Sequence, residues 1–305
     1  MSAPAFRGGA SPLVVSIVST KGGVGKTTTA ANLGGFLADA GMRVLLIDLD
    51  IQPTLSSYFP LDRRAPGGIY ELLAFNEQDP GQLISSTAIG GLDLLLSNDG
   101  KGQLGHPAAA RRGGRLRLRN LLGMFRSRYD VVLIDTQGAR CVTLEMAILA
   151  SDFSLSPVTP EILAARELRR GTLSLMDDIA PYRHLGIEPP PLRLLINRAR
   201  TVSVNGRQIQ HALRGMFQQV SGIHVLETTI PAIEAYPAAA LRRLPVHRVE
   251  PRRPRGRLAP AALESQRALA GEVVSDVARP VRSCHGAKPC QRHVTAGLQV
   301  RHCSA

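Results

Sequence analysis

The chain has 305 residues, of which 44% are hydrophobic, and its formal net charge at pH 7 is +13. This length can bury a substantial core, and one α/β domain of about 250 residues is expected. No apolar run is long enough to span a membrane, and residues 1–12 lack the apolar stretch of a secretory signal. These features predict a cytoplasmic protein.

The first informative element is a strand followed by a glycine-rich loop. Residues 13–18, LVVSIV, form a β-branched run typical of a buried parallel strand, and residues 19–29 then read STKGGVGKTTT. Glycines in such a loop allow backbone N–H groups to converge on phosphate oxygens, and the helix that follows adds its positive end. Lys26 is placed to reach the β- and γ-phosphates, and the Thr27 hydroxyl to bind Mg²⁺.

Lys21 has no place in that minimal loop. The chain contains 37 basic residues but only four lysines, and two of them, Lys21 and Lys26, lie within six residues. Lysine is a compact point charge, whereas arginine is a planar fork. We infer that both lysines serve the chemistry of the loop and that Lys21 has a role of its own.

Further strands end in acids. After a helix whose apolar residues recur at helical spacing and which ends at Gly41, residues 44–47 predict a strand followed by Asp48 and Asp50. Residues 131–134 predict another strand, which ends at Asp135. Only one strand, residues 92–96, is expected between residues 60 and 115, where glycine, proline and polar residues are frequent.

The remaining elements complete an α/β pattern. Strands are predicted at residues 153–158 and 192–196, and helices around residues 118–125, 162–176, 203–220 and 261–277. The pattern favours an open, mainly parallel twisted sheet flanked by helices on both faces. Ligands of such sheets bind at the carboxyl ends of the strands, where the acids lie.

The loop with its extra lysine, the Asp-x-Asp after the next strand and the later strand ending in Asp135 together resemble the ParA/MinD family of P-loop ATPases. Within that family, the chain is most similar to ParA-type partition proteins of integrating conjugative elements. The resemblance covers about residues 12–270. It implies a P-loop NTPase fold, ATP and Mg²⁺ as ligands, and a homodimer that sandwiches ATP.

The resemblance also implies roles for single residues. Lys21 matches the signature lysine that reaches the nucleotide of a second subunit, Lys26 the phosphate-loop lysine, and Asp50 the acid that orients or activates the attacking water. Asn197 matches a residue that reads adenine, and residues 229–231 match a loop that closes over the base. The implied nucleotide contacts are Gly22, Gly23, Val24, Gly25, Lys26, Thr27, Thr28, Asn197 and Pro231, and the implied magnesium site is Thr27, Asp48 and Asp135, the acids acting through water. Strand-end caps for Asp48 and Asp50, and a turn residue for Asn197, are the alternatives.

Two segments depart from the family pattern. Ile51-Gln52-Pro53 stands where many members have Pro-Gln, and residues 136–140, TQGAR, follow Asp135 where many have x-Pro-Pro. We call residues 136–140 the switch loop. Gly138 in place of a proline is expected to make this loop more mobile and to offer an N–H to the γ-phosphate.

Positive charge is concentrated near the carboxyl end, where residues 241–305 carry 13 basic and four acidic residues. Attraction to DNA phosphates is salt-sensitive and independent of base sequence, and ParA-like proteins bind DNA in this way when dimerised with ATP. Pro245, Pro251 and Pro254 are expected to keep residues 242–257 extended and accessible. The candidate DNA contacts are Arg242, Arg243, Arg248, Arg252 and Arg253. The alternative is that an arginine-rich composition covers solvated faces.

Residues 1–12 are expected to form a flexible arm, residues 13–277 the ATPase domain, and residues 278–305 a disordered, atypical tail in which Cys284, Cys290 and Cys303 leave a metal site conceivable. No arginine finger is evident beyond Lys21, so weak ATP hydrolysis that needs an accelerator is expected. The resemblance implies that a ParB-like partner supplies this stimulation. The first alternative function is a MinD-like positioning ATPase that cycles on a membrane or surface apparatus, and membrane cycling would need an apolar C-terminal helix face. The second is a kinase or small-molecule ligase.

Overall fold

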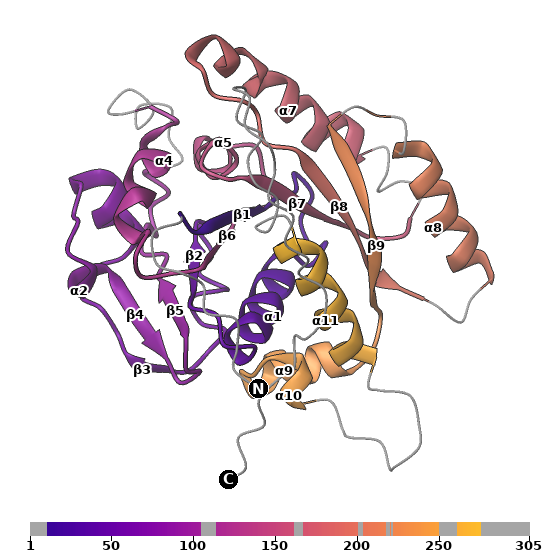
Figure 1. The fold of residues 1–305 in the computed structure, drawn as a ribbon, viewed down its shortest axis with the longest axis horizontal. Coiled ribbons are helices and arrows are strands. Elements are labelled where there is room, and N and C mark those ends of the chain that lie inside the picture. Colours follow the sequence, from indigo (N-terminus) through magenta and orange to yellow (C-terminus); the bar gives the residue numbers. More distant parts are fainter. Residues whose placement is uncertain are drawn as a thin grey trace, which may run out of the picture.

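The computed structural model describes residues 11–104, 114–161, 167–200, 204–217, 220, 222–249 and 261–275. In this part of the chain, nine strands form one sheet in the order β3-β4-β5-β2-β6-β1-β7-β8-β9 (Figure 1). Their bounds are β1 Leu13–Ile17, β2 Val44–Asp48, β3 Leu61–Arg63, β4 Ile84–Thr87, β5 Leu92–Leu95, β6 Val131–Asp135, β7 Phe153–Val158, β8 Leu192–Ala199 and β9 Ile223–Pro231.

The strands from β5 to β9 along this order pair in parallel, and β4 and β3 add an antiparallel edge. The predicted open, mainly parallel sheet is therefore confirmed. The expectation of a single strand between residues 60 and 115 is wrong, because β3 and β4 lie there beside β5. Their sequences, LDR and ISST, are short and polar, so they lack the apolar run on which the prediction relied.

Helices cover both faces of the sheet (Figure 1). Alternate residues of β6 point to opposite faces, so Val131 and Leu133 join a core with α1 and α11, whereas Val132 and Ile134 join a core with α4 and α5. The helical bounds are α1 Lys26–Asp39, η1 Glu71–Phe75, α2 Pro80–Leu83, α4 Arg117–Leu121, η2 Leu122–Phe125, α5 Val142–Leu149, η3 Arg169–Leu173, α7 Ser174–Ile179, η4 Ala180–Leu185, α8 Val204–Phe217, α9 Ala235–Arg242, α10 Val246–Val249 and α11 Ala261–Val274.

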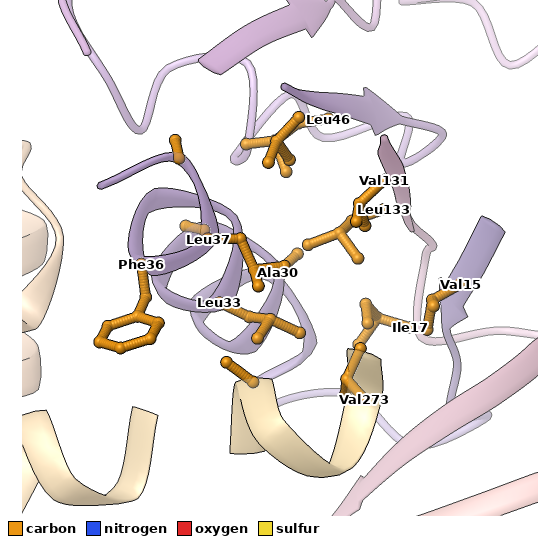
Figure 2. Close-up of a cluster of buried hydrophobic side chains, with 14 of the residues drawn as sticks. Val15, Ile17, Ala30, Leu33, Phe36, Leu37, Leu46, Val131, Leu133 and Val273 are labelled. Carbon is orange, nitrogen blue, oxygen red and sulfur yellow. The ribbon is translucent and has the colours of Figure 1, made fainter. Parts of the chain in front are cut away.

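Helix α1 is buried along most of its length. Its Leu33, Phe36 and Leu37 are fully buried. In Figure 2, Leu33 lies near the end of α11, whereas Phe36 points away from the sheet, and its ring centroid lies 5.2 Å from that of His247. Burying one such side chain contributes about 1.5–3 kcal/mol. The helix that begins at the phosphate loop is therefore fixed in the core, and so is the position of the loop.

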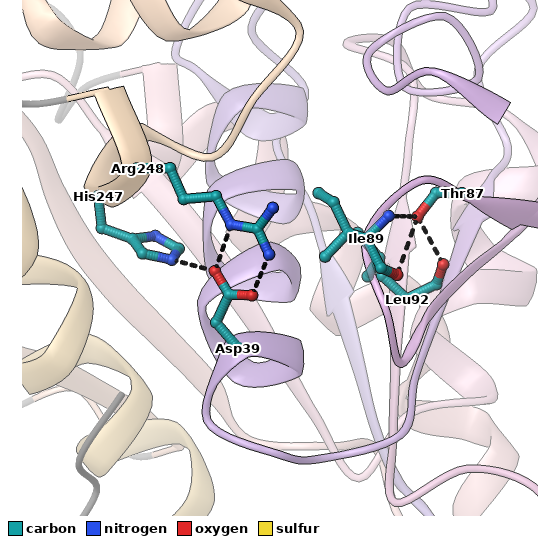
Figure 3. A network of polar contacts seen from close by, with 6 residues as sticks. All are labelled: Asp39, Thr87, Ile89, Leu92, His247 and Arg248. Atoms are coloured by element: carbon teal, nitrogen blue, oxygen red, sulfur yellow. Dashed lines mark hydrogen bonds and ion pairs between the residues drawn. The ribbon is translucent and has the colours of Figure 1, made fainter. Parts of the chain in front are cut away.

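The segment after β9 returns to α1. Asp39, at the end of α1, accepts hydrogen bonds from His247 (2.6 Å) and from Arg248 Nε (2.7 Å), as Figure 3 shows. The backbone N–H of Val246 donates to Asn32 Oδ1 at 2.7 Å.

The turn between β4 and β5 is closed by Thr87, whose hydroxyl accepts a hydrogen bond from Ile89 N and donates one to Leu92 O, as Figure 3 also shows.

Candidate functional site: a phosphate loop with a buried acid pair

The phosphate loop connects β1 to α1 at the carboxyl end of the sheet. Gly23 and Gly25 have φ of 75° and 94°, which side chains rarely tolerate. A Cβ on Gly25 would lie 2.3 Å from Asn197 Nδ2, so the loop also needs the missing side chain for space. The loop places the N-terminal N–H groups of α1 at the site, an arrangement that suits phosphate oxygens.

Lys26 lies beneath this loop and is only 7% exposed. Its Nζ donates to the carbonyl oxygen of Lys21 at 3.4 Å. Burial lowers the pKa of Lys26, while the charges of Asp135 and Asp50 act in the opposite direction. A partly desolvated ammonium beside the loop is suited to an anionic ligand, whose charge would repay the burial.

Asp48 and Asp135 lie side by side as register partners at the ends of β2 and β6, and both are fully buried. Thr27 Oγ1 donates to Asp135 Oδ2 at 2.7 Å. The other oxygen, Asp135 Oδ1, is buried without a hydrogen-bond partner among the described residues. Burial raises the pKa of both carboxyls, and the charge of Asp48 raises that of Asp135 further.

These side chains fit a magnesium ion. A hydroxyl, two carboxylates and one unpartnered buried carboxylate oxygen are the oxygen-rich, anionic surroundings that Mg²⁺ prefers. A cation would also relieve the repulsion between two adjacent buried acids. The sequence-predicted Thr27, Asp48 and Asp135 are thus brought together.

Ser56 and Ser97, which the sequence did not predict as site residues, hold Asp48 and the backbone of Asp50 in place. Asp48 Oδ2 accepts from Ser56 N (2.8 Å) and Ser56 Oγ (2.7 Å), and Ser56 Oγ accepts from Ser97 N (2.8 Å). Ser97 Oγ donates to Asp50 O at 2.6 Å. Isolated serines in loops carry no periodic signal, so only the folded chain reveals this network.

Asp50 is partly exposed at the edge of the site, and its Oδ1 accepts from Gln52 N at 3.0 Å. Its backbone N–H donates to Asp48 Oδ1 at 3.1 Å, so the two acids of the Asp-x-Asp are coupled. The remaining Asp50 oxygen is placed to accept a hydrogen bond from a water molecule.

The loop after Asp135 passes close to the phosphate loop. A Cβ on Gly138 would lie 2.9 Å from Gly22 Cα and 3.1 Å from Lys26 Nζ. Thr136 Oγ1 anchors the start of the loop by donating to Ile17 O at 2.7 Å, and Arg140 anchors its end by pairing with Asp178. Glycine at position 138 is therefore required for close approach as well as offering conformational freedom.

Lys21 lies at the front of the loop and is 34% exposed. Its Nζ lies 2.8 Å from Glu167 Oε2 and 3.9 Å from Glu161 Oε2. The hydrogen bond to Glu167 raises the pKa of Lys21. In this structure Lys21 is thus paired with acids of its own chain.

The two residues implied in base recognition lie on neighbouring strands. Asn197 is buried on β8, where its Nδ2 donates to Val24 O at 2.7 Å, so it braces the phosphate loop. Pro231 ends β9 and is the register partner of Ala199. The expected loop at residues 229–231 is wrong in one respect, because these residues continue β9 through its pairing with β8.

The expectation of an extended arginine segment is wrong for its described part, although the arginines there are exposed as expected. Arg242 ends α9, Arg243 Nη2 donates to Phe59 O at 2.7 Å, and Arg248 lies in α10 bonded to Asp39. Pro245 is buried rather than exposed. All three arginines remain exposed in part, whereas Arg252 and Arg253 lie outside the described residues.

The tail also lies outside the described residues, as do residues 1–10 of the arm. In the described ranges, no helix combines the length and apolarity required to cross a membrane. Within the same ranges, no metal site built from three or more His, Cys, Asp or Glu side chains is found, and the magnesium site described above instead combines two acids with a threonine hydroxyl.

A glycine loop before a buried helix, a buried lysine and an acid pair beside a threonine hydroxyl define a P-loop nucleotide-binding protein. Residues 13–179, more than half of the chain, match the AAA_31 family, described as an AAA domain. A ParA family protein of Chlamydia pneumoniae is 33% identical over 159 residues, which cover 51% of this chain and 62% of that protein. MinD of Helicobacter pylori, a septum site-determining protein, is 30% identical over 199 residues, covering 65% of this chain and 71% of MinD. The chain belongs to the ParA/MinD family of P-loop ATPases.

Solved structures show the same fold. The ATP complex of Cyanothece McdA(D38A) has a TM-score of 0.71 at 23% identity and covers 88% of this chain and 98% of its own. A plasmid partition protein of Borrelia burgdorferi bound to AMPPNP has a TM-score of 0.63 at 24% identity, covering 87% and 99%. Cobyrinic acid a,c-diamide synthase of Mycobacterium smegmatis, with ADP and magnesium, has a TM-score of 0.66 at 24% identity, covering 88% and 97%. The fold therefore serves more than one reaction, and the function rests on the site.

Proposed function

We propose that this protein is an ATPase that dimerises with ATP, binds DNA without sequence preference and acts in partition or maintenance of a chromosome, plasmid or integrative element. The observation that carries this proposal is Lys21, a partly exposed lysine at the front of a complete phosphate and magnesium site. Lys26 already supplies the buried cation of the site, so a second lysine is not needed for the nucleotide of the same subunit, and Lys21 would reach a nucleotide held by a second subunit.

The site residues support hydrolysis of ATP. The loop amides and Lys26 would hold the phosphates, and Thr27, Asp48 and Asp135 would hold Mg²⁺, which neutralises phosphate charge when bound. Asp50 would orient water at the partly exposed edge, since its backbone is fixed by Asp48 and Ser97. Asn197 and Pro231 lie at the carboxyl ends of β8 and β9, where the base would sit.

Of the three described candidate arginines, Arg242 is proposed as the DNA contact, because Arg243 is bonded to Phe59 and Arg248 to Asp39. Arg242 is exposed at the end of α9, next to Leu241, which is 87% exposed. Arg248 is held by Asp39 and is less suited to a phosphate contact. A ParB-like partner would stimulate hydrolysis and release DNA, and the protein would associate with the nucleoid in the cytoplasm.

A MinD-like positioning ATPase is the second candidate, and the similarity to MinD of Helicobacter pylori favours it. Such a protein would sediment with anionic lipid vesicles in the presence of ATP. The partition ATPase would remain in the supernatant and bind DNA instead.

DNA binding measured by fluorescence anisotropy tests the proposal. The protein should bind a duplex of random sequence with ATP and Mg²⁺, and weakly with ADP. Lys21→Ala should lose the difference between ATP and ADP, whereas Asp50→Ala should keep ATP-dependent binding and hydrolyse ATP slowly. Equal DNA affinity in all nucleotide states would show that binding reflects only the positive charge of the protein and not an ATP-dependent dimer.

A further inference from the structure

One short segment, residues 167–178, contacts both loops of the nucleotide site. It comprises Glu167, the η3 turn and most of α7. Near its start it holds the front of the phosphate loop, and near its end it holds the loop that follows Asp135. We call this segment the clasp.

The first contact is with Lys21. Glu167 Oε2 lies 2.8 Å from Lys21 Nζ, and both side chains reach solvent, with exposures of 52% and 34%. Ion pairs exposed to water to this extent are weak, because water competes for both charges. Glu167 can therefore direct Lys21 without holding it permanently.

The second contact fixes the backbone beside Lys21. Thr20 N donates to Thr172 Oγ1 at 3.4 Å, and a Cβ on Gly171 would lie 1.9 Å from Thr20 Oγ1. The η3 turn is thus in direct contact with the loop residue before Lys21. The hydrogen bonding of this turn is π-helical, a feature that is frequent at functional sites.

The third contact is with the switch loop. Arg140 pairs with Asp178 and also lies 3.5 Å from Ser174 Oγ. Gly138, two residues earlier, is packed on Gly22 and Lys26. A displacement of α7 would therefore be felt at both the phosphate loop and the loop after the buried acid Asp135.

We propose that the clasp is a restraint that keeps Lys21 turned toward its own chain, and that the ATP-bound dimer forms only when Glu167 releases Lys21. This inference rests on the proposed sandwich dimer, because Lys21 cannot pair with Glu167 and reach the nucleotide of a second subunit at once. Release of Lys21 and dimer assembly are then thermodynamically linked, so weakening the pair favours the dimer. Arg140 extends the same restraint to the switch loop.

Two readouts on the full chain test the clasp. The first is acylation of Lys21 by an amine-reactive ester without nucleotide, followed by mass spectrometry and normalised to the exposed Lys101. The second is the ATP concentration that gives half-maximal dimer in analytical ultracentrifugation. The variants are Glu167→Gln, its conservative counterpart Glu167→Asp, and Asp178→Asn, with Glu188→Gln as the matched control, because Glu188 forms a similar exposed pair with Arg183 away from Lys21.

Glu167→Gln should increase Lys21 labelling about threefold and lower the half-maximal ATP concentration by a similar factor, a size typical of an exposed ion pair. Asp178→Asn should lower the ATP concentration in the same direction, while Glu167→Asp and Glu188→Gln should resemble the unmodified chain. Unchanged Lys21 labelling in Glu167→Gln would overturn the clasp, whatever the oligomeric state. Increased labelling with an unchanged ATP concentration would overturn its control of assembly. If the chain never dimerises with ATP, both the proposed function and the control of assembly by the clasp are refuted. Lys21 labelling still tests the contact between Lys21 and Glu167 in that case.

Discussion

The hydroxyl of Thr27 donates a 2.7 Å hydrogen bond to one oxygen of the Asp135 carboxylate, and the other oxygen of that carboxylate is buried without a hydrogen-bond partner among the described residues. Thr27 lies in the first turn of α1 and Asp135 ends β6, so two core elements set this geometry. The unpartnered oxygen and the adjacent Asp48 leave a buried anionic site for a cation to neutralise.

Removing the Thr27 hydroxyl should therefore weaken nucleotide binding only when Mg²⁺ is present. Thr27→Ala is expected to bind a non-hydrolysable ATP analogue about tenfold or more weakly with Mg²⁺, by titration calorimetry. In EDTA the variant and the unmodified chain should bind alike, and Thr27→Ser should behave as the unmodified chain with Mg²⁺. Equal losses in EDTA and in Mg²⁺ would contradict a magnesium role for Thr27.

Gly138 should tolerate no side chain. In Gly138→Ala the new Cβ would meet Gly22 backbone atoms at 2.9–3.0 Å, so the phosphate loop or the switch loop must shift. Overpacking of this kind costs about 1–3 kcal/mol, which corresponds to at least a fivefold loss of nucleotide affinity if the loop geometry absorbs it. Gly90→Ala is the control, because no atom lies within 4 Å of its Cβ. Normal binding by Gly138→Ala would show that the two loops are not in close contact.

The hydrogen-bonded group of Asp39, His247 and Arg248 should stabilise the fold at neutral pH and lose this effect in acid. Burial tends to raise the pKa of Asp39, but hydrogen bonds from His247 and Arg248 outweigh it and leave the pKa lowered. A carboxyl with a lowered folded-state pKa contributes stability above its unfolded pKa of about 4, and loses it as pH falls through the lower folded value.

Asp39→Asn should thus lower the free energy of unfolding by about 1–2 kcal/mol at pH 7, measured by urea denaturation. The difference from the unmodified chain should shrink as pH falls below about 4. Asp62→Asn, on the exposed strand β3, should have little effect. A constant difference across this pH range would rule out a charge-dependent cluster.

Arg242 and Arg248 should differ in their effects on DNA binding. Arg242→Ala is expected to reduce the dependence of log affinity on log salt concentration by about one, the share of one phosphate contact. Arg248→Ala should mainly lower stability, because Arg248 is bonded to Asp39. Arg183→Ala, which removes an exposed arginine paired with Glu188, is the control for net charge. Equal salt slopes for all three variants would place the DNA surface elsewhere.

The sequence predicted the parts of the fold that follow local rules. The buried strands β1, β2 and β6, the loop between β1 and α1, and the acids at strand ends were all readable, since periodicity and spacing act over a few residues. The paired positions of Asp48 and Asp135 follow from parallel strands ending at one edge.

Features set by distant contacts were not readable. Prolines near residue 245 suggested an extended segment, but Val246 bonds to Asn32 and Arg248 to Asp39, more than 200 residues away in the chain. The roles of Ser56 and Ser97 depend on their hydrogen bonds to Asp48 and Asp50, which only the folded chain shows. The partner of Lys21 was likewise hidden, because Glu167 lies in an unrelated helical segment.

Sedimentation of the full chain with ATP and Mg²⁺ tests whether Lys21 joins two subunits around ATP. The unmodified chain should double its mass with ATP and remain a monomer with ADP, and Lys21→Ala should remain a monomer even when ATP is bound. If Lys21→Ala binds ATP and still doubles its mass, Lys21 does not serve a second subunit.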